Sequence, residues 1–306
     1  MNSILILEQC LNGIQFGLML FLLTAGLTLV FGVMDTINLA HGSLYMTGAF
    51  FAASVSAATG SFLLGLLGAI TGTALLGAAL EIALLRRLYQ RDHLTQVLAT
   101  FALILVFNEV ARMIWGPQPL ALNVPKILAG PVELLPGFFY PAYRLLIIAI
   151  GLSVAAGLYF FIGCTRAGML VRAGASNRAM ALAMGVNVRK IFTIVFALGA
   201  ALAALAGALL GPLLAVQVGM GESVLILAFV VIVIGGIGSV RGAFSAALLV
   251  GMVDTAGRSL LPLGLRSVLS PAVASSVGPA LASILIYVLM AVVLFNRPQG
   301  LFTARA

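Results

Sequence analysis

The sequence carries little charge. Asp, Glu, Lys and Arg make up 8% of its 306 residues, whereas 62% are hydrophobic. A soluble domain has about 25% charged residues, so the composition excludes an ordinary soluble protein. A membrane-spanning helix needs about 20 apolar residues, which leaves room for about eight to ten helices. The composition therefore predicts an all-α, polytopic transmembrane helix bundle that forms one domain over residues 1–306.

Residues that carry chemistry are also scarce. The only lysines are Lys126 and Lys190, and neither follows the glycine-rich turn of a P-loop, so ATP binding of that kind is excluded. The only histidines are His41 and His93, which excludes a multi-histidine metal site. The two cysteines fit no metal or redox spacing. No catalytic constellation is visible, and we expect the chain itself to bind no cofactor and no metal.

Apolar stretches predict about nine membrane spans. They cover about 11–34, 39–58, 62–85, 94–115, 142–163, 190–215, 223–236, 242–257 and 276–295. The seventh and eighth are short and rich in glycine, which leaves a broken or re-entrant form open. Residues 1–10 contain no Lys or Arg, unlike a cleaved signal peptide, so we expect the first helix to be retained. The proline-rich connection 116–141 predicts an ordered loop rather than a folded domain.

The chain has a net charge of +8, and the positions of its basic residues predict its orientation in the membrane. Basic residues cluster beside apolar segments, as the positive-inside rule describes, which favours membrane topology over nucleic-acid binding. The clusters assigned to the cytoplasm are Arg86 with Arg87 and Arg91, Arg166–Lys190, and Arg297 with Arg305. The opposite side receives Lys126, Glu133, Arg144, Glu222, Arg258 and Arg266. Nine spans then place the N-terminus outside and the C-terminus inside, although an even number of spans remains open.

Ionisable residues near the membrane predict structural pairs rather than a proton relay. Glu109 and Arg112 are spaced i,i+3, and Asp254 and Arg258 are spaced i,i+4, so each pair can form along a helix. Glu81 has no partner at such a spacing, although Arg86 follows nearby.

The segment Asp35–Ser43 interrupts two apolar stretches and allows two interpretations. Asp35 and Asn38 are good turn and N-cap residues, which favours an ordinary cytoplasmic turn. Alternatively, the chain breaks inside the membrane and exposes polar groups to a passing solute. Non-helical backbone at that depth is tolerated only where it is buried or lines a cavity. Spacing alone does not decide between the two.

The basic segment Arg166–Lys190 contains no Asp or Glu. Residues Asn177–Met184 favour a short helix outside the bilayer, begun by Ser176 or Asn177 and ended by Gly185. The alternative is a loop that only sets topology and touches anionic lipid.

A third motif, Gly235–Gly242, is glycine-rich. Its glycines could cradle an anion, but no strand–turn–helix context supports a phosphate site. We therefore predict a tight turn between two helices.

Three blocks together resemble the LivH-type permeases of branched-chain amino acid ABC importers. They are Gly26–Met34 running into Ile37–Gly42, then Asn177–Gly185, then Gly235–Gly242, in the family's order and at similar separation. The resemblance covers essentially the whole chain. One departure is Arg241, where many members have proline, and a turn should survive that change.

The resemblance implies a permease subunit of the bacterial inner membrane that works with several partners. These are a homologous LivM-type permease, two cytoplasmic ATPases that use ATP and Mg, and a periplasmic binding protein. The short helix then becomes a coupling helix seated on an ATPase, with coupling residues Asn177, Arg178, Met180, Ala181, Met184 and Gly185. The chain itself is no enzyme. Membrane lipid is the remaining partner.

The resemblance also favours the pathway interpretation of the first motif. Its substrate-pathway residues would be Asp35, Asn38, His41, Ser43 and Tyr45. Alternating access would carry a zwitterionic amino acid, in keeping with the family. Two alternatives stay open: a permease of the same fold for urea, amides or other amino acids, and an ion-coupled secondary transporter.

Overall fold

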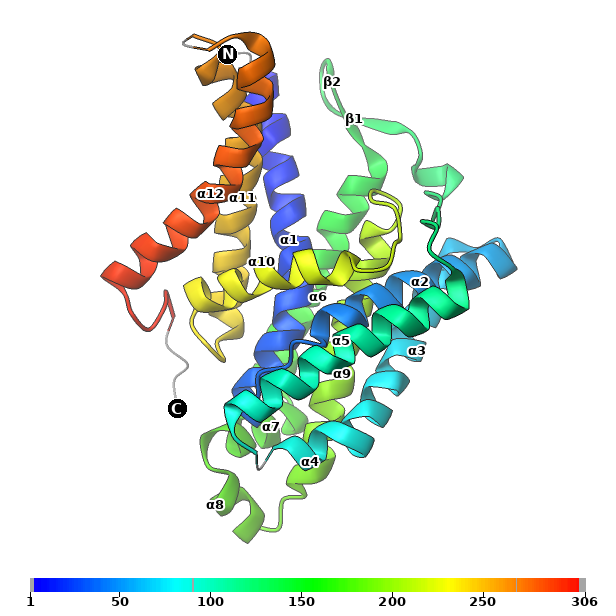
Figure 1. The fold of residues 1–306 in the computed structure, drawn as a ribbon, viewed down its shortest axis with the longest axis vertical. Coiled ribbons are helices and arrows are strands. Elements are labelled where there is room, and N and C mark those ends of the chain that lie inside the picture. Colours follow the sequence, from blue (N-terminus) through cyan, green and yellow to red (C-terminus); the bar gives the residue numbers. More distant parts are fainter. Residues whose placement is uncertain (1–2, 90, 268, 303–306) are drawn as a thin grey trace.

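The computed structural model describes residues 3–89, 91–267 and 269–302, so Arg305 lies outside the described residues. Helices dominate it (Figure 1). The long helices are α1 (Ser3–Met34), α2 (His41–Thr59), α3 (Phe62–Leu80), α5 (His93–Trp115), α6 (Ala142–Cys164), α9 (Val188–Leu210), α10 (Met220–Gly235), α11 (Val240–Leu265) and α12 (Pro271–Asn296). Shorter elements are the π-helix η1 (Glu81–Leu85), α4 (Arg86–Leu88), the 3₁₀ turn η2 (Lys126–Leu128), α7 (Arg166–Ser176) and α8 (Arg178–Ala183).

Within the described residues, seven helical stretches are long and apolar enough to cross a membrane by length and composition. They contain α1, α3 with α4, α5, α6, α9, α11 and α12. The other two predicted spans correspond to α2 and to α10, an apolar helix of 16 residues. The prediction of a polytopic all-α bundle is confirmed. The eighth span is longer than predicted, because α11 continues to Leu265.

Three helices form the centre of the bundle. The apolar windows of α1 and α9 are 83% and 72% buried, against 17% for α5, α6 and α12, and most of α2 is also buried. Small residues let these helices approach closely, as is common in membranes. A methyl group on Gly48 of α2 would lie 2.3 Å from Ala204 Cα of α9, and one on Gly26 of α1 would lie 3.0 Å from Gly199 Cα.

The two ends of the bundle differ. One end carries α4, α7 and α8, and we call it the basic end; the other carries an antiparallel hairpin, β1 (Pro131–Leu135) with β2 (Phe138–Pro141), and we call it the hairpin end (Figure 1). The hairpin is joined to the start of α1 by a 2.9 Å hydrogen bond from Tyr140 Oη to Asn12 Oδ1. The sequence predicted this connection only as an ordered loop.

A π-helical turn at the basic end explains the pairing of Glu81. Glu81 is fully buried, and Arg86 Nη2 donates to its Oε2 at 3.0 Å. An α-helix does not bring residues five apart onto one face, but the i→i+5 turn of η1 does. Thr193 Oγ1 of α9 donates to the same carboxylate at 2.7 Å and Tyr89 Oη at 3.1 Å. This network joins the α3–α4 stretch to α9.

The two predicted pairs are confirmed. Arg112 Nη1 lies 2.8 Å from Glu109 Oε1, and both side chains are more than half exposed. Arg258 Nε lies 2.8 Å from Asp254 Oδ1, and Arg258 Nη2 also donates to Ser283 of α12.

The Glu81 network predicts a measurable stability difference. Glu81→Ala should lower the free energy of unfolding by about 2–3 kcal/mol, because a buried hydrogen-bonded charge is lost and its donors remain. The matched change Glu109→Ala removes one member of a pair in which both side chains are more than half exposed, so the free energy of unfolding should fall by less. The unfolding temperature of the purified chain in detergent measures both effects. Equal shifts for the two variants would contradict a structural role for the network.

Candidate translocation and coupling sites

The chain re-enters the bundle after α1. It turns at Asp35, whose φ of 52° is left-handed, and runs without helical structure to Ala40 before α2 begins at His41. His41 Nε2 donates to the carbonyl oxygen of Leu23 at 3.2 Å. Leu23 lies about 16 Å before the end of α1 at 1.5 Å per residue, or about half the thickness of a hydrocarbon core. Helix α2 therefore begins deep in the membrane region, beside the middle of α1.

Asn38 shapes this re-entrant segment. Its Oδ1 accepts a hydrogen bond from the backbone N–H of Ala40 at 3.0 Å, and its backbone oxygen accepts one from the N–H of His41. Such a side-chain turn satisfies backbone groups that have no helical partner. Asn38 is 2% exposed. The segment therefore has the turn chemistry of the first interpretation, and the pathway interpretation stays a prediction.

Several buried polar atoms near the start of α2 lack a partner in the described part of the chain. They are Asn38 Nδ2, His41 Nδ1 and Tyr45 Oη. Buried polar groups are nearly always hydrogen-bonded, so each exception calls for an explanation. Ser43 is buried as well, whereas Asp35 is exposed. The structure thus places four of the five predicted pathway residues inside the bundle, and leaves Asp35 at its surface.

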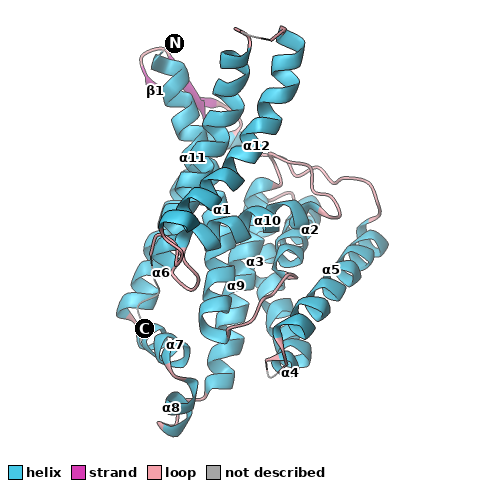
Figure 2. Cartoon of the chain, turned by 60° about the vertical axis from the view of Figure 1, so that its left-hand side comes forward, coloured by secondary structure: helices cyan, strands magenta, loops and turns pink. Residues whose placement is uncertain are grey.

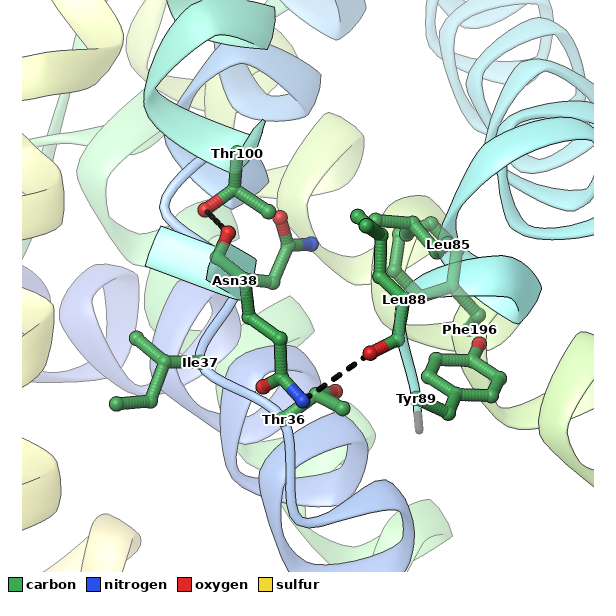
Figure 3. Close-up of a pocket in the computed structure, with 9 residues that line it drawn as sticks. Thr36, Ile37, Asn38, Leu85, Leu88, Tyr89, Thr100 and Phe196 are labelled. Carbon is green, nitrogen blue, oxygen red and sulfur yellow. Dashed lines mark hydrogen bonds between the residues drawn. The ribbon is translucent and has the colours of Figure 1, made fainter. Parts of the chain in front are cut away.

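A small pocket lies beside the re-entrant segment. Figure 3 shows Thr36, Ile37 and Asn38 on one side and Leu85, Leu88 and Phe196 on the other. Gln96 of α5 also lines it, and its Nε2 donates to the backbone oxygens of Leu88 and Arg91 at 3.3 and 3.0 Å. The residues that line the pocket therefore come from the segment, from the turn around α4, from α5 and from α9.

The start of α10 meets the start of α2. A methyl group on Gly221 would lie 2.0 Å from the backbone oxygen of Gly42, so only glycine allows this approach. The backbone N–H of Gly219 donates to Met46 Sδ at 3.3 Å. Two helix N-termini therefore lie together in the interior, where each carries a partial positive charge.

The predicted short helix in the basic segment is present as α8. Asn177, rather than Ser176, caps it, and its Oδ1 accepts from the backbone N–H of Met180 at 2.9 Å. Gly185 follows with φ 80°. The N–H groups of Gly185 and Val186 donate to the carbonyls of Leu182 and Ala181, the pattern of a Schellman motif.

Helix α8 presents an apolar surface. Met180, Leu182 and Met184 are 61%, 53% and 77% exposed, whereas Ala181 is 5% exposed and faces the bundle. The side chain of Arg178 lies outside the described residues. Exposed methionines and leucines on a polar end are typical of a protein-docking surface. Among the predicted coupling residues, the methionines are thus presented outward and Ala181 is not.

Helix α7 was missed by the sequence interpretation. It packs against α1, α6 and α9, and its buried residues are Gly168, Val171 and Gly174. Its signals were present in the sequence: Thr165 caps it by accepting from the N–H of Gly168 at 3.0 Å, and the three buried residues recur every third position.

The third motif forms a tight turn between α10 and α11, as predicted. Gly236 and Gly238 have φ of 100° and 77°, and Ser239 caps α11. The chain end closes the turn, because the N–H groups of Leu301 and Phe302 donate to the last carbonyls of α10. In a separate contact, Arg241 lies over the ring of Tyr159 at 5.1 Å from its centroid, so the departure from proline adds a cation–π contact.

Comparison with known proteins gives the family. The model for "Branched-chain amino acid transport system / permease component" matches residues 9–294. The chain belongs to this permease family. It is 29% identical to the branched-chain amino acid permease BraD of Pseudomonas aeruginosa, over 96% of this chain and 95% of that protein. It is 28% identical to LivH of Escherichia coli K12 (86% and 90% covered) and 24% identical to a probable LivH of Methanocaldococcus jannaschii (80% and 78% covered). No solved structure matches.

Family membership settles the class of protein. The chain is a transport subunit and not an enzyme, and ATP hydrolysis belongs to separate ATPase subunits. It is a multi-pass protein of the inner membrane. The alternatives of an ion-coupled transporter and of another solute are not favoured by the relatives.

The contact between α2 and α10 predicts the effect of one methyl group. Gly221→Ala should lower the free energy of unfolding by about 1–3 kcal/mol, because overpacking must separate the two helices. Gly157→Ala in α6 is the matched control, since nothing lies within 4 Å of the added methyl group. This control should raise the free energy of unfolding by about 0.5–1 kcal/mol, because alanine is more favourable than glycine inside a helix. Unfolding temperatures that move in the same direction would contradict the packing.

Proposed function

We propose that this chain is one permease subunit of an ABC importer for leucine, isoleucine and valine. The observation that carries the proposal is the re-entrant segment at the centre of a chain whose full-length relatives are named as permeases for these amino acids. A second permease subunit of similar fold would face it, two ATPases would lie under the basic end, and a binding protein would deliver substrate at the hairpin end.

Helix α8 is the proposed contact with the ATPase. It lies at the basic end, which the positive-inside rule assigns to the cytoplasm. Hydrogen bonds cap both of its ends. Its outward methionines suit an apolar groove on a partner. Closure of the ATPases on ATP would move α8, and the bundle would alternate between two arrangements.

The re-entrant segment is the proposed lining of the pathway. Asn38, His41, Ser43 and Tyr45 supply neutral polar groups, and three of them hold buried atoms without a partner in the described residues. A zwitterion crossing the membrane needs such groups because water is absent there. In the arrangement described here these groups are enclosed, so the pathway would open only when α2 moves relative to α9 and α10.

The pathway proposal predicts a loss of transport per assembled transporter. Asn38→Ala and His41→Ala should each reduce ATP-dependent uptake of radiolabelled leucine at least about tenfold in proteoliposomes, because polar partners along the route are lost. Thr73→Ala is the control, since Thr73 is buried with an unpartnered hydroxyl on α3, away from the segment. Uptake is divided by the amount of assembled transporter. Wild-type uptake in both variants would refute the pathway role.

The coupling proposal predicts a different defect. The double change Met180→Lys with Met184→Lys should reduce ATPase stimulation by loaded binding protein at least about tenfold, because charge enters an apolar interface. The fold should persist, since both side chains are exposed. Met169→Lys, an exposed methionine of α7 at the same end, is the control. Unchanged stimulation in the double variant would remove α8 from the coupling contact.

A further inference from the structure

Glu222 lies deeper than its position in the sequence suggests. The sequence predicts an external connection at Glu222, but this residue lies in the first turn of α10. The preceding residue, Gly221, touches the backbone of Gly42, next to His41. The hydrogen bond of His41 to Leu23 fixes that level near the middle of α1. Glu222 is therefore at the depth of the membrane interior.

A second contact also places Glu222 away from both ends of a membrane-spanning helix. Asn108 Nδ2 of α5 donates to Glu222 Oε1 at 2.5 Å. Along α5, Asn108 lies about 22 Å from the helix start and about 10 Å from its end, at 1.5 Å per residue. Helices α5 and α10 both pack against α2 (Figure 2). The hydrogen bond joins α5 to α10 directly.

Glu222 also lacks a counter-charge in the described residues. The ion pairs found there involve Glu81, Glu109 and Asp254, and none includes Glu222. Asn108 offers an amide, which orients the carboxylate but leaves its charge. Yet Glu222 is exposed on the surface of the chain. A carboxylate at this depth is too costly to face lipid, and such residues face a bundle interior or a water-filled cavity.

We propose that Glu222, held by Asn108, binds the α-ammonium group of the amino acid on the face that α5 and α10 turn toward the second permease subunit. The inference rests on the proposed function and specifies a substrate contact within it. The positive end of α10 stabilises the carboxylate while the site is empty. Ile226, one turn further along α10 and 54% exposed, offers apolar surface for the aliphatic side chain.

The test uses the complete transporter in proteoliposomes with loaded binding protein and radiolabelled leucine. Glu222→Gln keeps the shape and removes the charge. We expect normal assembly and normal ATPase stimulation. The amount of leucine transported per ATP hydrolysed should fall at least about tenfold, which is the effect expected from the loss of one charged contact. Glu109→Gln is the matched control, because Glu109 is the exposed acid next to Asn108 and already pairs with Arg112.

A second variant keeps the proposal falsifiable if Glu222→Gln folds poorly. Asn108→Ala retains the carboxylate and removes its positioning, so leucine per ATP should fall by a smaller factor, with recovery in Asn108→Gln. Wild-type transport per ATP in Glu222→Gln would overturn the inference. A loss of assembled transporter in Glu222→Gln, together with wild-type leucine per ATP in Asn108→Ala, would also overturn it. Absence of ATP-dependent leucine uptake by the wild-type transporter would instead refute the proposed function.

Discussion

The structure depends on one constraint: backbone polar groups inside a bilayer must be satisfied within the protein. The non-helical stretch between Asp35 and His41 violates the simplest solution, a continuous helix. It is tolerated because residues of η1, α4, α5 and α9 lie beside it, and because Asn38 replaces missing helical partners. The central position of α2 and the glycine contacts around it follow from this need. A break in a peripheral helix would have met lipid.

The same constraint explains which features the sequence predicted. Apolar stretches of about 20 residues are set by membrane thickness, so helix positions could be found from composition. The cap of α8 and the glycine turn at Gly236 are local, so local chemistry identified the turn and narrowed the cap to Ser176 or Asn177. The pairing of Glu81 with Arg86 was not predictable, because it requires a π-helical turn. The spacing of residues in the sequence does not indicate such a turn.

The depth of polar residues was the least accessible information. Asn38 and Glu222 both stand near apparent loops in the sequence, yet contacts with Leu23, Gly42 and Asn108 place their surroundings in the interior. Depth depends on how far a chain folds back after a helix ends, and this is a tertiary property. Because hydropathy is averaged over a window of sequence, such residues are assigned to the loop that precedes them. The candidate site could therefore be named by residue type, but only the fold shows that it is buried.

The connection between the two candidate sites runs through α9. A short link from α8 leads directly into α9 at Val188, and Thr193 of α9 is joined to the buried Glu81. Further along, Gly199 meets Gly26 of α1, Ala204 meets Gly48 of α2, and Gly207 meets the carbonyl of Tyr45. Backbones in such contact have no flexible side chains between them to absorb a displacement, and close-packed interiors transmit strain. A shift of α8 would therefore be passed along α9 to the first turns of α2, where the unpartnered polar atoms lie. The small residues that allow the re-entrant segment to be enclosed are thus also the ones that would make its position sensitive to the basic end.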